Sequence, residues 1–154
     1  MKIDIGGGEH TKLDFKNVDK YYRFADFKED VLSLSFKNNS IEEAFSKHTF
    51  EHLSKKEVRI ALKEVYRILM PKAKFTIIVP DMEWCVKKWL NSPDKLGRSL
   101  DWIFGGQSCK GDLHKIGYTM ETLSSLLKEA GFKIVQKDVY FDFDFQALKI
   151  KAIK

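Results

Sequence analysis

The segment from Ser54 to Val79 constrains the fold most, because an amphipathic helix there leads into a buried strand. Ser54 stands at an N-cap position, and Glu57 three residues later completes a capping box. Apolar residues then recur at helical spacing at Val58, Ala61, Leu62, Val65, Ile68 and Leu69. Pro71 ends the helix, and the run from Phe75 to Val79 is typical of a buried parallel strand. This order of elements predicts an α/β fold.

The rest of the chain repeats the alternation of short apolar runs and helical patterns. We predict strands at 2–5, 15–18, 43–47, 133–141 and 145–153, helices at 83–90 and 119–130, a short element at 30–34, and irregular structure at 91–118. The pattern indicates a single domain, 1–154, with a mostly parallel sheet and a closing antiparallel strand pair. The fold class expected is a Rossmann-like three-layer sandwich whose first crossover helix is short or missing.

Composition and charge exclude several classes of protein. Hydrophobic residues make up 44% and charged residues 32% of the 154, which indicates a globular chain, and no apolar run approaches the roughly 20 residues of a membrane span. Cys85 and Cys109 form no CxxC pair, so we expect free thiols and a cytoplasmic location. The net charge of +5 is scattered over lysines, with only four arginines. A nucleic-acid partner is therefore not expected, although an RNA-modifying enzyme stays as an alternative.

A glycine-rich turn, Gly6-Gly7-Gly8, follows the first predicted strand. Glycine permits positive φ and a close approach of backbone to ligand. A dinucleotide site would need a helix after these glycines to hold a pyrophosphate, but the next strand begins too soon for a helical crossover. The missing helix argues against NAD or FAD and is compatible with a nucleoside cofactor that carries no phosphate.

Acidic and histidine side chains follow the other predicted strands, where ligands of such sheets bind. Asp19 could accept both hydroxyls of a ribose or simply open a loop. Asp30 could accept from an adenine amino group or cap a turn. His48 and Asp81 also follow strands, and Asp81 could orient a substrate or cap the next helix.

An ordered set of motifs resembles the class I S-adenosylmethionine-dependent methyltransferases, and most closely a small subgroup of predicted bacterial methyltransferases. The matching pieces are Asp4-Ile5-Gly6-Gly7-Gly8, Asn17-Val18-Asp19, Asp30 with Leu34-Ser35-Phe36, Asn39-Ser40-Ile41, His48 to Leu53, Ala61 to Pro71, Val79-Pro80-Asp81, Phe104 to Gln107, His114 to Thr119, and Glu129 to Phe132. The resemblance covers nearly the whole chain.

The resemblance implies S-adenosylmethionine as the cofactor. It implies cofactor-binding roles for Asp4, Gly6, Gly7, Gly8, Asp19, Asp30 and His48. The glycines would line the methionine end, Asp19 the ribose and Asp30 the adenine, with His48 near the sulfonium. Family members often carry a helix before the first strand, which this sequence lacks, so we expect that a homodimer or a partner subunit covers the N-terminal side.

The expected reaction is methyl transfer to an oxygen or nitrogen atom of a small-molecule or saccharide substrate. His114, His48 and Asp81 are, in that order, the candidates for a catalytic base. The alternative for His114 is a structural role, as a loop histidine that packs on Tyr118. A non-catalytic or partner-dependent binding subunit stays as the main alternative.

Three other patterns have competing interpretations. His48-Thr49-Phe50-Glu51-His52 spells the H-x-x-E-H string of some zinc peptidases, but it lies at a strand end rather than on a helix, so we expect no metal. Trp84, Trp89 and Trp102 could wall a substrate cleft, although simple packing is favoured. Alternating phenylalanine and aspartate from Phe141 to Phe145 predicts a strand with a solvated acidic face.

Overall fold

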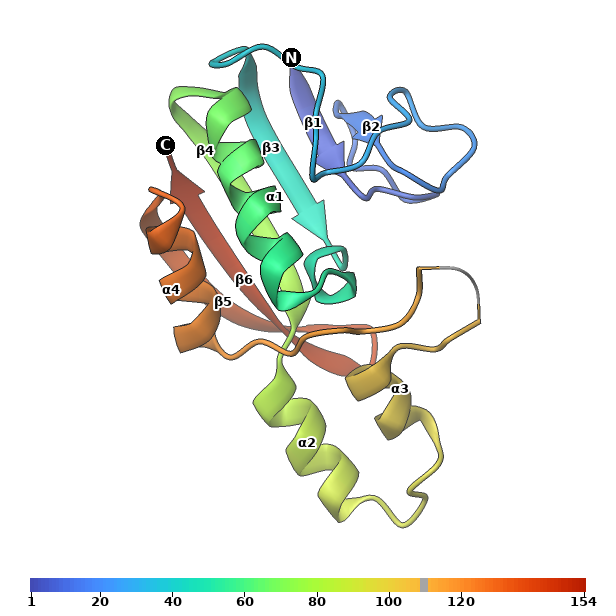
Figure 1. The fold of residues 1–154 in the computed structure, drawn as a ribbon. Helices are drawn as coiled ribbons and strands as arrows, with labels where there is room; N and C mark the ends of the chain where they lie inside the picture. The colour runs from blue at the N-terminus through green and yellow to red at the C-terminus, as the bar shows by residue number, and fades with distance from the viewer. Residues whose placement is uncertain (109–110) are drawn as a thin grey trace.

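The fold is built on one six-stranded sheet with the order β2-β1-β3-β4-β6-β5 (Figure 1). The computed structural model describes residues 1–108 and 111–154, so the expectation of a free thiol at Cys109 lies outside the described residues. The strands are β1 Lys2–Ile5, β2 Lys16–Val18, β3 Ile41–Lys47, β4 Leu69–Pro80, β5 Lys133–Asp142 and β6 Phe145–Ile153. The helices are η1 Phe50–His52, α1 Lys55–Ile68, α2 Met82–Asn91, α3 Arg98–Phe104 and α4 Met120–Glu129.

The pairing confirms the predicted mixed sheet. Strands β2, β1, β3 and β4 pair parallel, whereas β6 runs antiparallel to both β4 and β5. The predicted capping box forms at Ser54 on α1, and a second one forms at Thr119 on α4. The helix α1 ends at Ile68, ahead of Pro71, and β4 starts at the next residue, Leu69.

The strand predicted from Phe75 begins six residues earlier, at Leu69, and two other predicted elements differ in kind from the structure. Residues 30–34 form a turn rather than a strand or helix, because Asp30 closes it through its own carbonyl to the amide of Ser33 and through its carboxylate to the amide of Leu32. The segment 91–118, for which we predict irregular structure, contains the helix α3. This short helix lacks a side-chain cap and buries only Ser99, so its sequence carries no strong helical signal.

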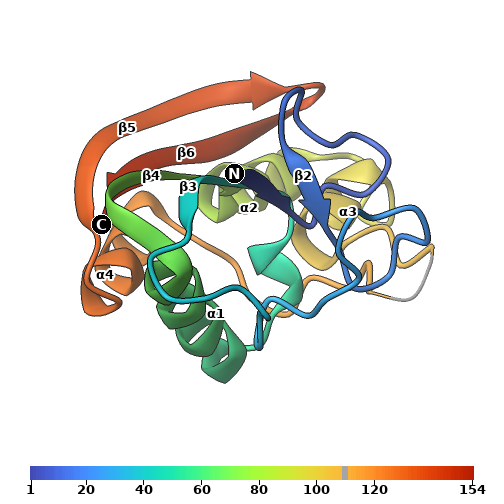
Figure 2. The ribbon, with the colours of Figure 1, turned by 90° about the horizontal axis from the view of Figure 1, so that it is seen from above.

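Helices flank the sheet unevenly. In Figure 2, α1 and α4 lie on one face, and no helix of the described chain lies on the opposite face. Right-handed crossovers place the β3-to-β4 helix and any β1-to-β2 helix on opposite faces, because the two connections move in opposite directions along the sheet. Residues 6–15 between β1 and β2 contain no helix, as the sequence predicted. The second helical layer of a three-layer sandwich is therefore missing at this position.

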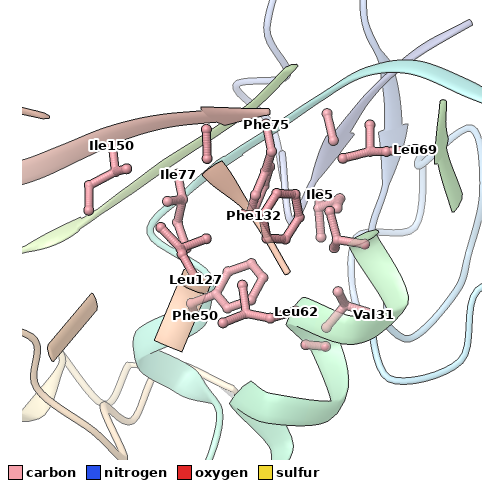
Figure 3. Packing of buried hydrophobic residues seen from close by; sticks show 14 of the residues in the cluster. Ile5, Val31, Phe50, Leu62, Leu69, Phe75, Ile77, Leu127, Phe132 and Ile150 are labelled. Carbon is pink, nitrogen blue, oxygen red and sulfur yellow. The ribbon is translucent and has the colours of Figure 1, made fainter. Parts of the chain in front are cut away.

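The main core lies between the sheet and the helices α1 and α4. Figure 3 shows Phe50, Phe75 and Phe132 meeting at its centre, beside Leu62 from α1 and Leu127 from α4. All five side chains are buried. No helix among the described residues is long and apolar enough to span a bilayer. This core fixes the positions of the strand ends that carry the candidate site.

Candidate active site

The carboxyl ends of β1, β2 and β3 meet at one edge of the sheet and open onto a cavity of about 330 Å³. Gly6, Asp19 and His48 each directly follow one of these strands, and Asp30 joins them from the turn beyond β2. The apolar part of the lining includes Val31. Four of the sequence-predicted binding residues therefore surround the same space.

The glycine turn owes its shape to close packing against residue 49. Gly6 has a φ of +73°, and a Cβ there would lie 2.1 Å from the Oγ1 of Thr49. The Thr49 hydroxyl in turn donates to the carbonyl of Ile5 at 3.1 Å. Only glycine fits where the end of β1 and the segment after β3 approach each other this closely.

The other residues predicted around this turn support it from behind and do not line the cavity. Gly8 donates its amide to Asp19 Oδ2 at 3.2 Å, and a Cβ on Gly7 would meet Asn17 Oδ1 at 3.0 Å. Asp4 is buried, and its Oδ2 accepts from the amide of Lys12 at 2.6 Å. Burial raises the pKa of Asp4. These contacts hold the loop in place rather than face a ligand.

The two carboxylates of the cavity are already oriented by backbone and lysine donors. Asp19 Oδ1 accepts from the amides of Tyr21 and Tyr22 at 2.7 and 2.9 Å. Asp30 Oδ2 accepts from the ammonium of Lys20 at 2.7 Å. Burial tends to raise the pKa of Asp30, but the hydrogen bonds from Lys20 and from the Leu32 amide, together with the nearby lysine charges, outweigh it and the net pKa is lowered. Both groups are therefore fixed acceptors at the cavity wall.

His48 is held between two carboxylates. Its Nδ1 lies 3.2 Å from Glu51 Oε1 and its Nε2 lies 2.6 Å from Asp142 Oδ2, which Lys47 also approaches at 2.9 Å. Burial alone would lower the pKa of His48, but Glu51 and Asp142 more than compensate and the net pKa is raised. Neither ring nitrogen is free in this arrangement, which favours a positioned imidazolium over a general base.

A second cavity of about 420 Å³ adjoins the first, since His48 and His52 line both. His114 lines only the second cavity, and its ring lies edge-on to that of His52 with centroids 5.0 Å apart. Burial lowers the pKa of His114, so its imidazole is neutral near pH 7. Trp102 from α3 forms part of the wall.

Asp81 takes the capping position rather than a place in either cavity. Its Oδ1 accepts from the amides of Glu83 and Trp84 at the start of α2, and its Oδ2 accepts from Gln146 at 2.7 Å. Among the candidate bases, the structure brings His114 and His48 to the cavities and leaves Asp81 behind them.

The prediction of a solvated acidic face at the end of β5 is wrong for Asp142, which is 7% exposed. The strand ends there, and its last side chain reaches Lys47 and His48 at the end of β3, 94 residues away in the sequence from the histidine. Phe141 and Phe143 are instead 64% and 90% exposed. The contact of Asp142 with Lys47 and His48 depends on how the strands pack, and the local sequence pattern does not indicate it.

The tryptophans divide between the two interpretations. Trp84 packs on Trp102 and Phe141 at centroid distances of 5.1 and 5.7 Å, while Trp89 donates to the carbonyl of Lys95 near the surface. Of the three, only Trp102 lines a cavity. The aromatic cluster thus both packs α2 against α3 and contributes one wall of the second cavity.

Comparison with solved structures defines the class of fold. A SAM-dependent methyltransferase from Methanosarcina mazei matches at 18% identity and a TM-score of 0.73, over 99% of this chain and 91% of that one. A Burkholderia thailandensis N1-methyltransferase, solved with 1,6-didemethyltoxoflavin and S-adenosylhomocysteine, matches at 16% identity and a TM-score of 0.69, over 99% and 70%. A Haloferax volcanii protein solved with a methyltransferase activator matches at 16% and 0.69, over 99% and 80%. At these identities the likeness shows the fold.

The sequence itself matches a family model over part of its length. Residues 4–77 match the family model described as a methyltransferase domain, which spans the glycine turn, both carboxylates and His48. No curated protein matches the chain. The match over residues 4–77 and the shared fold both support a class I S-adenosylmethionine-dependent methyltransferase.

Proposed function

We propose that the chain binds S-adenosylmethionine in the first cavity and methylates an oxygen or nitrogen atom of a small-molecule or saccharide acceptor in the second. The observation that carries this proposal is the pair of adjoining cavities with His48 and His52 between them. The first cavity has the glycine turn and two fixed carboxylates, and the second has a neutral histidine.

The residues of the first cavity fit a nucleoside without a phosphate. Asp19 and Asp30 present acceptors for hydroxyl and amino groups, and Val31 offers an apolar surface for a base. No helix starts after the glycine turn of β1 to receive a pyrophosphate. The proposed assignments are Asp19 to the ribose, Asp30 to the adenine, and Gly6 and His48 to the methionine end.

When bound, S-adenosylmethionine supplies a methyl group on a sulfonium sulfur, which is already a good leaving group. The protein then has to align the acceptor with that methyl group and exclude water. We assign His114 the preparation of the acceptor, because its imidazole is neutral and lines the second cavity. His48 keeps the boundary of the two cavities positively charged and fixed.

Calorimetric titration with S-adenosylhomocysteine tests the proposal. We expect micromolar binding by the wild-type chain and at least a tenfold loss in Asp19→Asn. Asp26→Asn is the matched control, because Asp26 also accepts a backbone amide, from Asn17 at 2.8 Å, but does not line the cavity.

Unchanged affinity in Asp19→Asn would remove the ribose assignment. A folded wild-type chain that fails to bind would instead favour the non-catalytic or partner-dependent alternative.

A further inference from the structure

We propose that Glu51, His52 and His114 bind a divalent cation of the zinc class, which holds and polarises an acceptor hydroxyl in the second cavity. One ligand atom from each of these residues lies within 4.8 Å of the others. All three side chains line the second cavity. The inference rests on the proposed function for its role, but the cation site itself stands on geometry.

Glu51 supplies the observation that points to a missing ligand. The residue is 2% exposed, and its Oε1 is engaged by His48, whereas its Oε2 is buried without a hydrogen-bond partner among the described residues. A buried carboxylate oxygen left unpaired is costly, and buried charges are normally paired or coordinate a metal. A cation in the adjoining cavity would satisfy this oxygen.

The two histidines are arranged as metal ligands usually are. His52 Nδ1 lies 3.2 Å from the carbonyl oxygen of Leu113, to which it can donate, and this leaves Nε2 with its lone pair free. Metal-bound histidines typically donate their other ring nitrogen to a carbonyl in this way. The ring of His114 hydrogen-bonds to the backbone of Trp102 and lies against that of His52.

The segments that carry these ligands are tied together before any ion binds. The carbonyl of Glu51 accepts from the amides of Lys115 and Ile116 at 2.8 and 3.3 Å, and the Tyr118 hydroxyl donates to the carbonyl of Phe50 at 3.0 Å. Only the side chains then have to rotate for the histidine nitrogens to approach a zinc ion to the usual zinc–nitrogen distance of about 2.1 Å.

The charge and ligand type select the cation. Asp101 and Asp112 add negative charge to the lining of the second cavity. The one arginine of that lining, Arg98, forms an ion pair with Asp144, which does not line the cavity. Two imidazoles and one carboxylate suit Zn²⁺, as in zinc hydrolases that keep an open position. Mg²⁺ prefers an all-oxygen shell and is disfavoured.

This site is not the zinc-peptidase arrangement that the H-x-x-E-H string suggests. The string crosses from the end of β3 into the single turn η1, so His48 and His52 do not share a helical face. His48 instead pairs with Glu51 and Asp142, and the third ligand comes from His114, far along the chain. The expectation of no metal rested on the string alone and did not include His114.

In the proposed reaction, the acceptor hydroxyl occupies the open position on the cation. His114 then prepares the acceptor as a ligand of the cation and not as a base. Coordination lowers the pKa of the hydroxyl, so that its proton leaves to solvent and its oxygen attacks the methyl carbon. The carbon–sulfur bond breaks, and S-adenosylhomocysteine and the methyl ether are the products. The acceptor class is therefore an alcohol rather than an amine.

The test is calorimetric titration of untagged, metal-free protein with Zn²⁺, and separately with Mg²⁺. We expect one Zn²⁺ per chain, at least about tenfold weaker binding in His114→Ala, and no comparable Mg²⁺ binding. His10→Ala is the matched control, since His10 is exposed and lines neither cavity. Glu51→Gln should also weaken Zn²⁺ binding if that variant folds.

The same samples are titrated with S-adenosylhomocysteine, which separates the two proposals. Zn²⁺ binding that is absent in the wild type, or unchanged in His114→Ala, would overturn the cation site even if the nucleoside binds. Equal affinity for Mg²⁺ would overturn the choice of cation. Zn²⁺ binding without nucleoside binding would keep the site and remove the proposed function.

Discussion

At the scale of single residues, the site depends on backbone positions that only particular side chains can occupy. Gly6 and His48 both have positive φ, at +73° and +54°, and each directly follows a strand of the site. Such conformations cost a residue with a Cβ about 1–2 kcal/mol. Strained residues at the wall of a ligand cavity indicate that geometry for binding outweighs local stability.

We predict that Gly6→Ala destabilises the protein more than Gly8→Ala does. Both positions have positive φ, but a Cβ at Gly6 would overlap Thr49, whereas a Cβ at Gly8 would meet nothing within 4 Å. Urea unfolding should therefore give a loss of about 1 kcal/mol for Gly8→Ala and a clearly larger loss for Gly6→Ala. Equal losses of unfolding free energy would show that the Thr49 side chain moves aside without destabilising the protein, and that packing does not require glycine at residue 6.

At the scale of elements, α1 is the helix whose ends are defined most sharply by sequence. Ser54 Oγ accepts from the amide of Glu57, and Glu57 Oε2 accepts from the amide of Ser54 at 2.7 Å. Five residues on one face of this helix are buried against the sheet. The helix begins immediately after η1, so its N-terminal cap also fixes where Glu51 and His52 lie.

We predict that Ser54→Ala lowers the free energy of unfolding by about 1 kcal/mol, because the Glu57 amide loses its acceptor. Ser92→Ala is the control, since Ser92 lies at the C-terminal end of α2 and receives no helical amide. We expect the control to change stability by less than about 0.5 kcal/mol in chemical denaturation. A Ser54→Ala loss no larger than the control's would mean that the cap contributes nothing.

At the scale of the whole molecule, one charge network joins elements from both ends of the chain. Lys47 ends β3 and His48 follows it, Glu51 belongs to η1, and Asp142 ends β5. Burial opposes the charged form of each carboxylate, but it is outweighed by His48 and His52 together at Glu51 and by His48 and Lys47 together at Asp142, so both pKa values are lowered. The network links the parallel part of the sheet to the closing strand pair.

We predict that this network stabilises the fold most between about pH 4.5 and 6.5, the unfolded-state pKa values of glutamate and histidine. His48 has a raised pKa, so its contribution is complete below pH 6.5 and is lost as the pH rises through its folded value. Glu51 and Asp142 have lowered values, so their contributions are lost as the pH falls below their unfolded values of 4.5 and 3.8.

The difference in unfolding free energy between the wild type and His48→Asn, measured across pH, isolates this effect. Asparagine tolerates the positive φ of residue 48. The difference should shrink as the pH rises above 6.5. His114, whose pKa is lowered, contributes with the opposite sign to both proteins and so cancels. A difference that is constant or grows above pH 6.5 would contradict the assignment of a charged His48.

The expected homodimer or partner subunit would cover the N-terminal side of the sheet, where the face opposite α1 and α4 carries no helix of the described residues. The H. volcanii structure shows a protein of this fold solved with an activator. For the present chain, a covering subunit stays a prediction.

Local sequence determined most of the fold. Capping boxes, helical apolar faces and β-branched runs act over a few residues, so β1, β3, α1, α4 and the β5–β6 pair were predicted close to their bounds. The same reasoning placed Gly6, Asp19, Asp30 and His48 at one edge, because parallel strands bring their carboxyl ends together. The short connection after β1 also predicted the missing helix.

Tertiary structure alone decided which distant side chains lie close together at the site. Asp142 follows an alternating pattern that indicates exposure, yet the end of β3 buries it against His48. His114 reaches Glu51 and His52 only because backbone hydrogen bonds tie its segment to η1. Such pairings depend on where whole elements pack, and the free energy that fixes them comes from the core rather than from the residues that meet.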